Sequence, residues 1–100
     1  MRLTIDLDDK TQFEKVKFKL LTLFGIIHEI YLSPSKRGYH FIVYNLPTTF
    51  EENIILREIC NDDKMRIYLD RTLIKKKPSQ VLWNEKGRKK AKLVYKNVTR

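Results

Sequence analysis

Cysteine, glycine, proline and long apolar runs are all scarce in this chain of 100 residues. The lone Cys60 cannot form a disulfide within the chain, and no Cys/His cluster indicates a zinc site. No stretch of about 18 apolar residues is present, so no segment is predicted to span a membrane. The first residues turn acidic at Asp6, which is not typical of a signal peptide. We therefore expect an intracellular, cytoplasmic protein, and the sequence indicates no cofactor.

Acidic residues are scarce in the last third of the chain only. Residues 64–100 contain thirteen Lys and Arg against Asp70 and Glu85, a net charge of +11. Residues 1–63 contain eight Lys and Arg against ten Asp and Glu, a net charge of −2, and the two sums give the +9 of the whole chain. Positive charge gathered on one part of a protein is typical of a surface that binds a polyanion. The sequence therefore predicts nucleic acid as the partner.

The periodicity of apolar residues predicts six elements in the first seventy residues. Residues 3, 5 and 7 alternate with polar ones as in a half-buried strand, and capping boxes at Thr11–Glu14 and Thr49–Glu52 predict two helix starts. Cys60 follows apolar residues of the second helix and is expected in the core. The predicted elements are a strand at 3–8, a helix ending at Gly25, strands at 26–32 and 39–44, a helix at 49–60 and a strand at 65–70.

This order is the β-α-β-β-α-β plan of ferredoxin-like, RRM-like α+β domains. Right-handed crossovers place the first predicted strand between the third and fourth, in an antiparallel sheet of order 4-1-3-2. Residues 1–70 are expected to form this core. Residues 71–100 are expected to add a basic connector and a β-hairpin, with arms at 81–84 and 92–95, to the same single domain.

The segment Arg37–Tyr44 resembles the RNP1 motif of the RNA-recognition-motif family, K/R-G-F/Y-G/A-F-V-x-F/Y. Six of the seven specified positions match if Ile counts as Val, and His40 is the departure. The resemblance implies that Tyr39 and Phe41 project from an exposed sheet face and stack on bases. It also implies that Arg37 reaches a phosphate.

The same region is also similar to the palm motifs of archaeo-eukaryotic primases. Residues 5–8 resemble the motif hhDhD, residues 35–40 resemble the motif S-G-x-G-x-H, and residues 66–70 resemble a third motif that ends in Asp. The resemblance implies that Asp6, Asp8 and Asp70 hold a divalent metal ion and that His40 contacts a nucleotide phosphate.

Physical reasoning supports only part of this metal site. Asp6 and Asp8 alternate on a strand and so share a face, and their oxygen ligands suit Mg²⁺ or Mn²⁺. Antiparallel pairing also places His40 beside the end of the first strand. In the predicted topology, however, Asp70 lies far from Asp8, and Asp62 or Asp63 is expected nearer.

The two resemblances require opposite orientations of the strand at 39–44. The RNP1 resemblance requires Tyr39 and Phe41 to face away from the helices, whereas the primase resemblance requires His40 and Ile42 to do so. Burying a histidine among apolar side chains requires a hydrogen-bond partner, which favours the second orientation.

The sequence favours a non-catalytic nucleic-acid-binding protein, DNA or RNA, with no assigned metal ligand or catalytic residue. One alternative is an assembly protein that forms a homodimer by strand addition and has no nucleic-acid role. Another is a metal-dependent, primase-like nucleotidyl-transfer relative that uses Asp6, Asp8 and His40. The small size and lysine-rich tail are similar to those of small proteins from archaeal viruses and plasmids. The residues predicted to bind nucleic acid are Lys36, Arg37, Tyr39, Phe41, Lys75, Lys76, Lys77, Trp83, Arg88, Lys89, Lys90 and Lys92.

Overall fold

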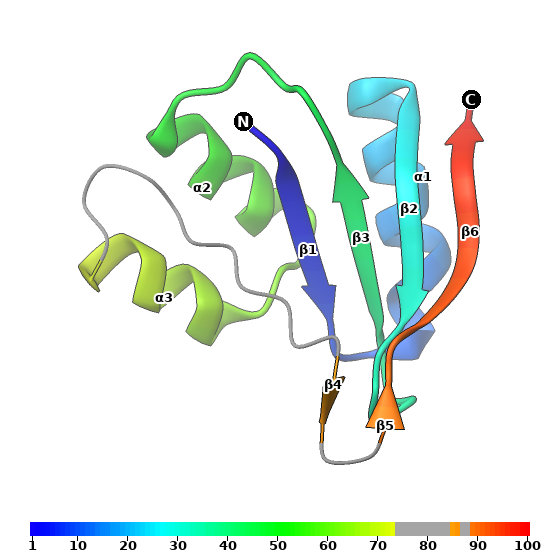
Figure 1. Ribbon diagram of the computed structural model, residues 1–100. Coiled ribbons are helices and arrows are strands. Elements are labelled where there is room, and N and C mark those ends of the chain that lie inside the picture. Colours follow the sequence, from blue (N-terminus) through cyan, green and yellow to red (C-terminus); the bar gives the residue numbers. More distant parts are fainter. Residues whose placement is uncertain (74–84, 87–88) are drawn as a thin grey trace.

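A computed structural model describes residues 1–73, 85–86 and 89–100 as an α+β fold (Figure 1). Four strands form an antiparallel sheet of order β1-β3-β2-β6, and β4 pairs with β5. The elements are β1 (Leu3–Leu7), a 3-10 turn (Lys10–Gln12), α1 (Phe13–Phe24), β2 (Ile26–Leu32), β3 (Tyr39–Val43), α2 (Phe50–Ile59), α3 (Lys64–Leu73), β4 (Glu85–Lys86), β5 (Lys89–Lys90) and β6 (Lys92–Thr99).

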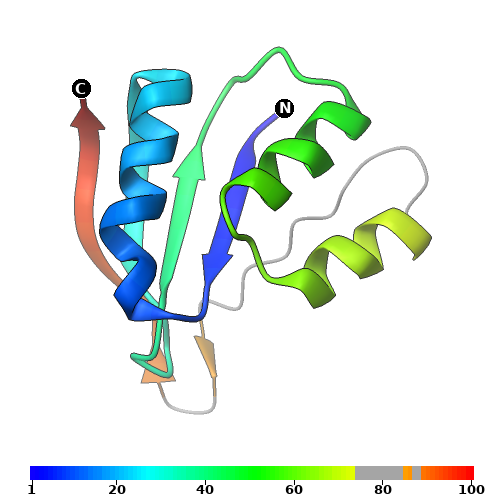
Figure 2. The ribbon, with the colours of Figure 1, turned by 180° about the vertical axis from the view of Figure 1, so that it is seen from behind.

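The hydrophobic core lies between the sheet and helices α1 and α2, which cover one face of the sheet and stand in front of it in Figure 2. Cys60 is part of this core, as expected, and burial raises the pKa of its thiol to about 11. The thiol is therefore protonated at neutral pH and unsuited to nucleophilic chemistry. The other fully buried members of the core are Leu3, Ile5, Leu7, Val16, Leu20, Ile27, Ile30, Phe41 and Val43.

Local sequence signals explain most of the helix ends. The capping box of α2 is confirmed, because the Thr49 side chain accepts from Glu52 N and the Glu52 side chain accepts from Thr49 N. Helix α1 ends at Gly25, whose φ of 76° suits glycine. The capping box predicted at Thr11 is wrong. Instead, the Asp9 side chain accepts from Thr11 N and caps the 3-10 turn that leads into α1.

The strand predicted at 65–70 is wrong, because these residues belong to helix α3. Their short apolar alternation also fits a helix, in which Ile67 and Asp70 share the buried side. The Asp63 side chain accepts from Met65 N at 2.7 Å, in the first turn of α3. The four-stranded antiparallel sheet is compatible with a ferredoxin-like fold, but the predicted order 4-1-3-2 is wrong. Among the described residues, β1 pairs with β3 alone.

The fourth strand of the sheet comes from the basic tail. Strand β6 contains residues 92–95, which were expected in a separate hairpin, and pairs antiparallel with β2. The other predicted hairpin arm, at 81–84, lies outside the described residues. The end of the chain is therefore part of the main sheet.

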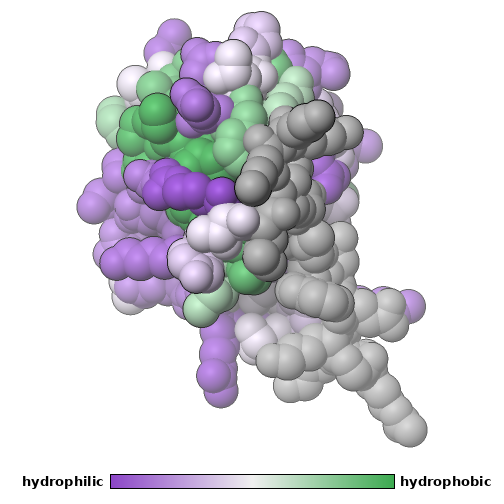
Figure 3. All heavy atoms as spheres, turned by 90° about the vertical axis from the view of Figure 1, so that its left-hand side faces the viewer, coloured by the Kyte–Doolittle hydropathy of each residue, from purple (hydrophilic) through white to green (hydrophobic). Residues whose placement is uncertain are grey.

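Two surfaces are relevant to the predicted self-assembly, which stays a prediction. Strand β6 lies at one end of the sheet, and its Leu93 and Tyr95 are exposed. Apolar side chains also gather on the side of the molecule that carries α2 and α3, where Ile55 and Tyr68 are exposed (Figure 3).

None of the helices in the described part of the chain is long and apolar enough to cross a membrane.

A buried network of two arginines and two aspartates joins α2 to α3. Arg57 on α2 is fully buried and donates from Nε to Asp62 Oδ2 at 2.7 Å and from Nη1 to Asp70 Oδ2 at 2.6 Å. Arg66 on α3 donates from Nη1 to the other Asp62 oxygen. The two guanidinium groups balance the two carboxylates, which is the condition under which such charges are tolerated in a protein interior.

The same network attaches the α2–α3 turn to the outer edge of β1. Asp6 N donates to Asp62 Oδ1 at 2.7 Å, and Asp63 N donates to Asp6 O at 3.1 Å. Arg66 Nη2 donates to Thr4 Oγ1 at 2.7 Å. These bonds satisfy backbone groups of Asp6 that a neighbouring strand would otherwise satisfy.

We predict that Arg57→Ala destabilises the protein by about 3–5 kcal/mol, because it removes the arginine that pairs with buried Asp70 and leaves buried Asp62 with Arg66 alone. The matched control is Arg71→Ala. Arg71 pairs with Glu58 at the surface, where the arginine is 54% exposed, and such a pair contributes about 0–1 kcal/mol. Urea unfolding followed by circular dichroism measures both free energies. Equal, small losses in the two variants would contradict a structural role for the buried network.

Candidate metal centre

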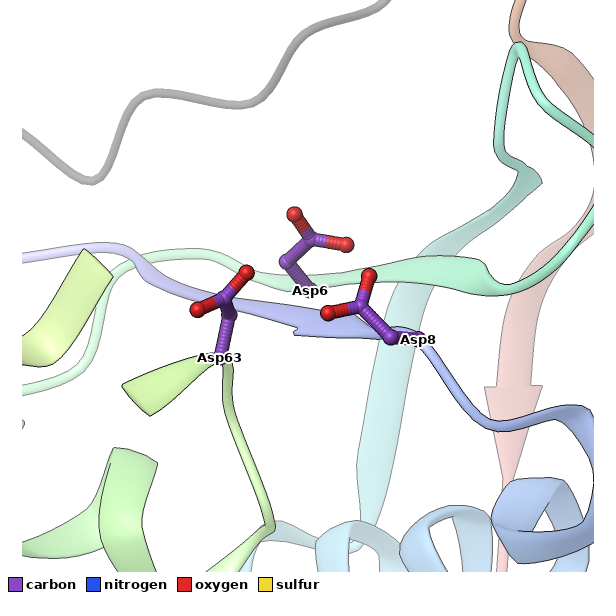
Figure 4. A group of neighbouring side chains, drawn as sticks. All are labelled: Asp6, Asp8 and Asp63. Carbon is purple, nitrogen blue, oxygen red and sulfur yellow. The ribbon is translucent and has the colours of Figure 1, made fainter. Parts of the chain in front are cut away.

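Three carboxylates converge beyond the end of β1. Asp6 and Asp8 come from β1 and the residue that follows it, and Asp63 comes from the α2–α3 turn. One oxygen of each lies within 4.8 Å of the other two, and Figure 4 shows the three groups facing a common space. Asp6 is partly buried and Asp8 is exposed. The spacing allows one cation to contact all three residues.

Backbone geometry explains why these three residues meet. Asp6 and Asp8 lie on either side of Leu7, whose side chain enters the core, so both carboxylates occupy the opposite face of the sheet. Asp63 follows Asp62, which the buried arginines hold against the edge of β1. The prediction that Asp62 or Asp63 lies nearer than Asp70 is confirmed. Asp70, implied as a ligand by the primase resemblance, instead pairs with Arg57.

Burial and repulsion disfavour the ionised forms of Asp6 and Asp8 in this cluster. Burial raises the pKa of Asp6 to about 6, with smaller increases from Asp62 and Asp63 and an opposing effect of Arg66. The pKa of Asp8, although this residue is exposed, is also raised to about 6, first by partial desolvation of its carboxylate and then by the charges of Asp6 and Asp63. A bound cation would offset both effects, because it favours the ionised carboxylates.

The donor set fits a hard divalent cation. Carboxylate oxygens are the ligands that Mg²⁺ and Mn²⁺ prefer, and each can leave further positions for water or a phosphate oxygen. Asp6, Asp8 and Asp63 would hold the ion. His40 is only 2% exposed, and its Nε2 lies 3.5 Å from Asp6 Oδ1, so it can orient that carboxylate.

The orientation of β3 is the one that places His40 on the carboxylate side. Asp6 and His40 are directly paired across β1 and β3. The RNP1-based expectation that Tyr39 and Phe41 project from an exposed face is therefore wrong. Phe41 is fully buried, and the rings of Tyr39 and Phe41 lie 4.4 and 5.6 Å from that of Phe13 on α1. The core requires these apolar side chains, and strand alternation then sends His40 the other way.

The loop between β2 and β3 lies against this centre. A side chain at Gly38 would clash with Leu7 O, so only glycine allows the loop to approach β1 this closely. Gly38 O accepts from Ser33 N, and Ser33 Oγ accepts from Gly38 N, which closes the loop. Lys36 and Arg37, which were predicted to contact phosphates, are exposed on this loop, and their phosphate binding stays a prediction.

The remaining predicted nucleic-acid-binding residues belong to the basic tail. Lys90 and Lys92 are exposed. Lys89 lies on β5. The other predicted residues, which lie outside the described part of the chain, are Lys75, Lys76, Lys77, Trp83 and Arg88.

The sequence indicated the carboxylates of the centre better than it indicated the buried ion pairs that hold them in place. The sequence signal was Arg57, which occupies the buried side of α2 with Asn53 at helical spacing. A charged residue at an inward position of a helix predicts a buried partner, but the partner's identity depends on the tertiary fold.

Comparison of the chain with models of protein families, with curated proteins and with solved structures finds no match.

We predict that the metal-free protein loses stability as pH rises from about 5 to 7. The folded state keeps protons on Asp6 and Asp8 up to a pKa of about 6, whereas the unfolded chain releases them near 4. The folded state therefore binds more protons in this interval, and the free energy of unfolding falls with pH. Urea unfolding in EDTA, across this pH range, measures the slope.

Asp8→Asn is the control for this slope, because it removes one raised pKa and the repulsion that acts on Asp6. The variant is expected to show a smaller loss between pH 5 and 7, and millimolar Mg²⁺ is expected to reduce the loss in the unmodified protein. An identical slope in the protein and the variant would show that the cluster does not govern this pH dependence.

Proposed function

We propose that the protein binds nucleic acid through a divalent cation held by Asp6, Asp8 and Asp63, with Lys36 and Arg37 contacting neighbouring phosphates. The observation that carries the proposal is the convergence of three carboxylates beside a cationic loop. A cation between carboxylates and a phosphate oxygen is a common way for acidic residues to bind a polyanion. Without the cation, the same carboxylates would repel it.

The charge of the chain supports the choice of ligand. A net charge of +9 attracts polyanions and favours rapid association with nucleic acid, and the excess positive charge lies in residues 64–100. Exposed cations also lie on β5 and β6, at Lys90 and Lys92. The three converging carboxylates would by themselves oppose a polyanion, and phosphate binding through a cation would make them compatible with the basic residues.

We predict that Mg²⁺ strengthens binding of a fluorescently labelled oligonucleotide in an anisotropy titration. Asp8→Asn should remove the difference between Mg²⁺ and EDTA, because it breaks the cation site. Lys36→Ala with Arg37→Ala should weaken binding under both conditions and reduce the slope of log K against log salt by about 1–2, since each phosphate contact contributes about 0.7–0.9 to the slope.

Lys15→Ala is the matched control, because Lys15 is exposed on α1, which covers the other face of the sheet. This variant should change affinity much less than the loop variants. Absence of binding at low salt would overturn the proposal. An affinity that changes neither with Mg²⁺ nor with Asp8→Asn would overturn the cation-mediated contact and leave purely electrostatic binding by the basic residues.

A second candidate is metal-dependent nucleotidyl transfer, which the supply of a third carboxylate by Asp63 favours. Phosphoryl transfer with divalent ions requires such a carboxylate set, and His40 stands beside Asp6. The expected result for this candidate is Mn²⁺-dependent primer extension or primer synthesis that Asp6→Asn abolishes. A product that persists in Asp6→Asn would come from a contaminant and would count against this candidate.

A further inference from the structure

Two tyrosines lie on the same face of the sheet as the carboxylate centre. Asp6 on β1 is paired with His40 on β3, and His40 is paired with Tyr31 on β2. Residues that are directly paired across strands share a face, so this row leads from the centre to Tyr31. With strands about 4.8 Å apart, Tyr31 stands two strands, or roughly 10 Å, from Asp6.

One carboxylate fixes both tyrosines. The Tyr31 hydroxyl donates to Glu29 Oε1 at 3.2 Å, and the Tyr44 hydroxyl donates to the same oxygen at 3.0 Å. Glu29 is paired with Ile42, which also faces away from Phe41 and the core. The ring of Tyr44 meets the ring of His28 edge to face at 5.3 Å, and Tyr44 N donates to His28 Nδ1. The two tyrosine rings are therefore held in place before any ligand arrives.

We infer that this face of the sheet binds single-stranded nucleic acid, with bases stacking on Tyr31 and Tyr44. The inference rests on the proposed function and adds the class of nucleic acid to it. An aromatic side chain can stack on a base only when that base is not enclosed in a duplex. Tyr44 is 37% exposed and Tyr31 is partly exposed, and their fixed rings lose little freedom on binding.

The charges around the two rings suit a phosphate backbone that passes beside them. Lys96 on β6 is exposed and paired with Glu29. Arg2 is exposed and lies near Tyr44, where its charge opposes the rise in the pKa of the hydroxyl that is caused first by burial and then by Glu29. Lys36 and Arg37 follow β2 on the loop toward β3. The strands and the loop around the tyrosines therefore carry cations that a phosphate backbone could contact, whereas the Glu29 carboxylate is engaged by the two tyrosine hydroxyls.

The test compares labelled single strands and duplexes of one sequence, in Mg²⁺, with variants of the two tyrosines. Tyr31→Leu and Tyr44→Ala should each weaken single-strand binding roughly tenfold, the scale of one stacked base, and leave duplex binding unchanged. Tyr31→Phe and Tyr44→Phe keep the ring but lose the hydrogen bond to Glu29, so each should weaken single-strand binding clearly less than the non-aromatic variant at the same position. The matched control is Phe18→Ala, an aromatic ring that is 70% exposed on α1 and should have no effect.

Fluorescence of 2-aminopurine within the single strand is a readout that does not depend on the overall stability of the protein. Stacking on a tyrosine should quench it, and the quenching should be lost in Tyr31→Leu and retained in Tyr31→Phe. Unchanged quenching and affinity in both non-aromatic variants, with Mg²⁺-dependent binding intact, would overturn this inference and leave the proposed function standing. Absence of any binding by the unmodified protein would overturn both.

Discussion

The buried pair of Arg57 and Asp62 is the interaction on which the rest of this structure depends. It fixes the turn between α2 and α3 at the edge of β1, where the backbone of Asp6 and the Asp62–Asp63 segment exchange hydrogen bonds. A sheet edge is normally satisfied by another strand or by solvent. Here the turn takes that place, so α3 can pack beside α2 instead of joining the sheet. The cost of burying a guanidinium group is offset only because two carboxylates meet it with short bonds.

Two adjacent aspartates in this turn therefore have opposite electrostatic surroundings. Asp62 is wholly buried and receives charge-assisted bonds from two arginines. Asp63 faces two further carboxylates, and its charge raises the pKa of both. Asp62, whose charge the arginines compensate, has a structural role and determines the position of Asp63. An uncompensated group of this kind is maintained at a cost in stability, which is common where a ligand completes the site. The geometry thus separates the residue that supports the centre from the residues that would contact a ligand.

Local patterns in the sequence predicted β1, α1, β2, β3 and α2, because each has a clear period or cap. They failed at residues 65–70, where six residues fit a strand and a helix equally well. The features that decide in favour of a helix are ion pairs with Arg57 and Asp62, and such partners become visible only once the chain is folded. The pairing of β6 with β2 is also a long-range choice, since a separate hairpin would satisfy the same residues locally. The alternation of Asp6 and Asp8 on one strand face could be predicted because it is a short-range rule, whereas the position of Asp63 depends on the tertiary fold.

The alternation of side chains between the two faces of β3 explains the positions of His40, Phe41 and Tyr31. A β-strand divides its side chains between two faces, so Phe41 cannot enter the core without His40 turning toward Asp6. That choice removes Tyr39 and Phe41 from any ligand and brings Tyr31 into the row that begins at the carboxylates. A shift of one residue in the register of β3 would exchange the whole set and bury polar groups in the core. The contact of Gly38 with Leu7 opposes such a shift, because a residue with a side chain at that place would clash with the end of β1. The register that closes the core is therefore the same register that places His40 beside Asp6 of the centre.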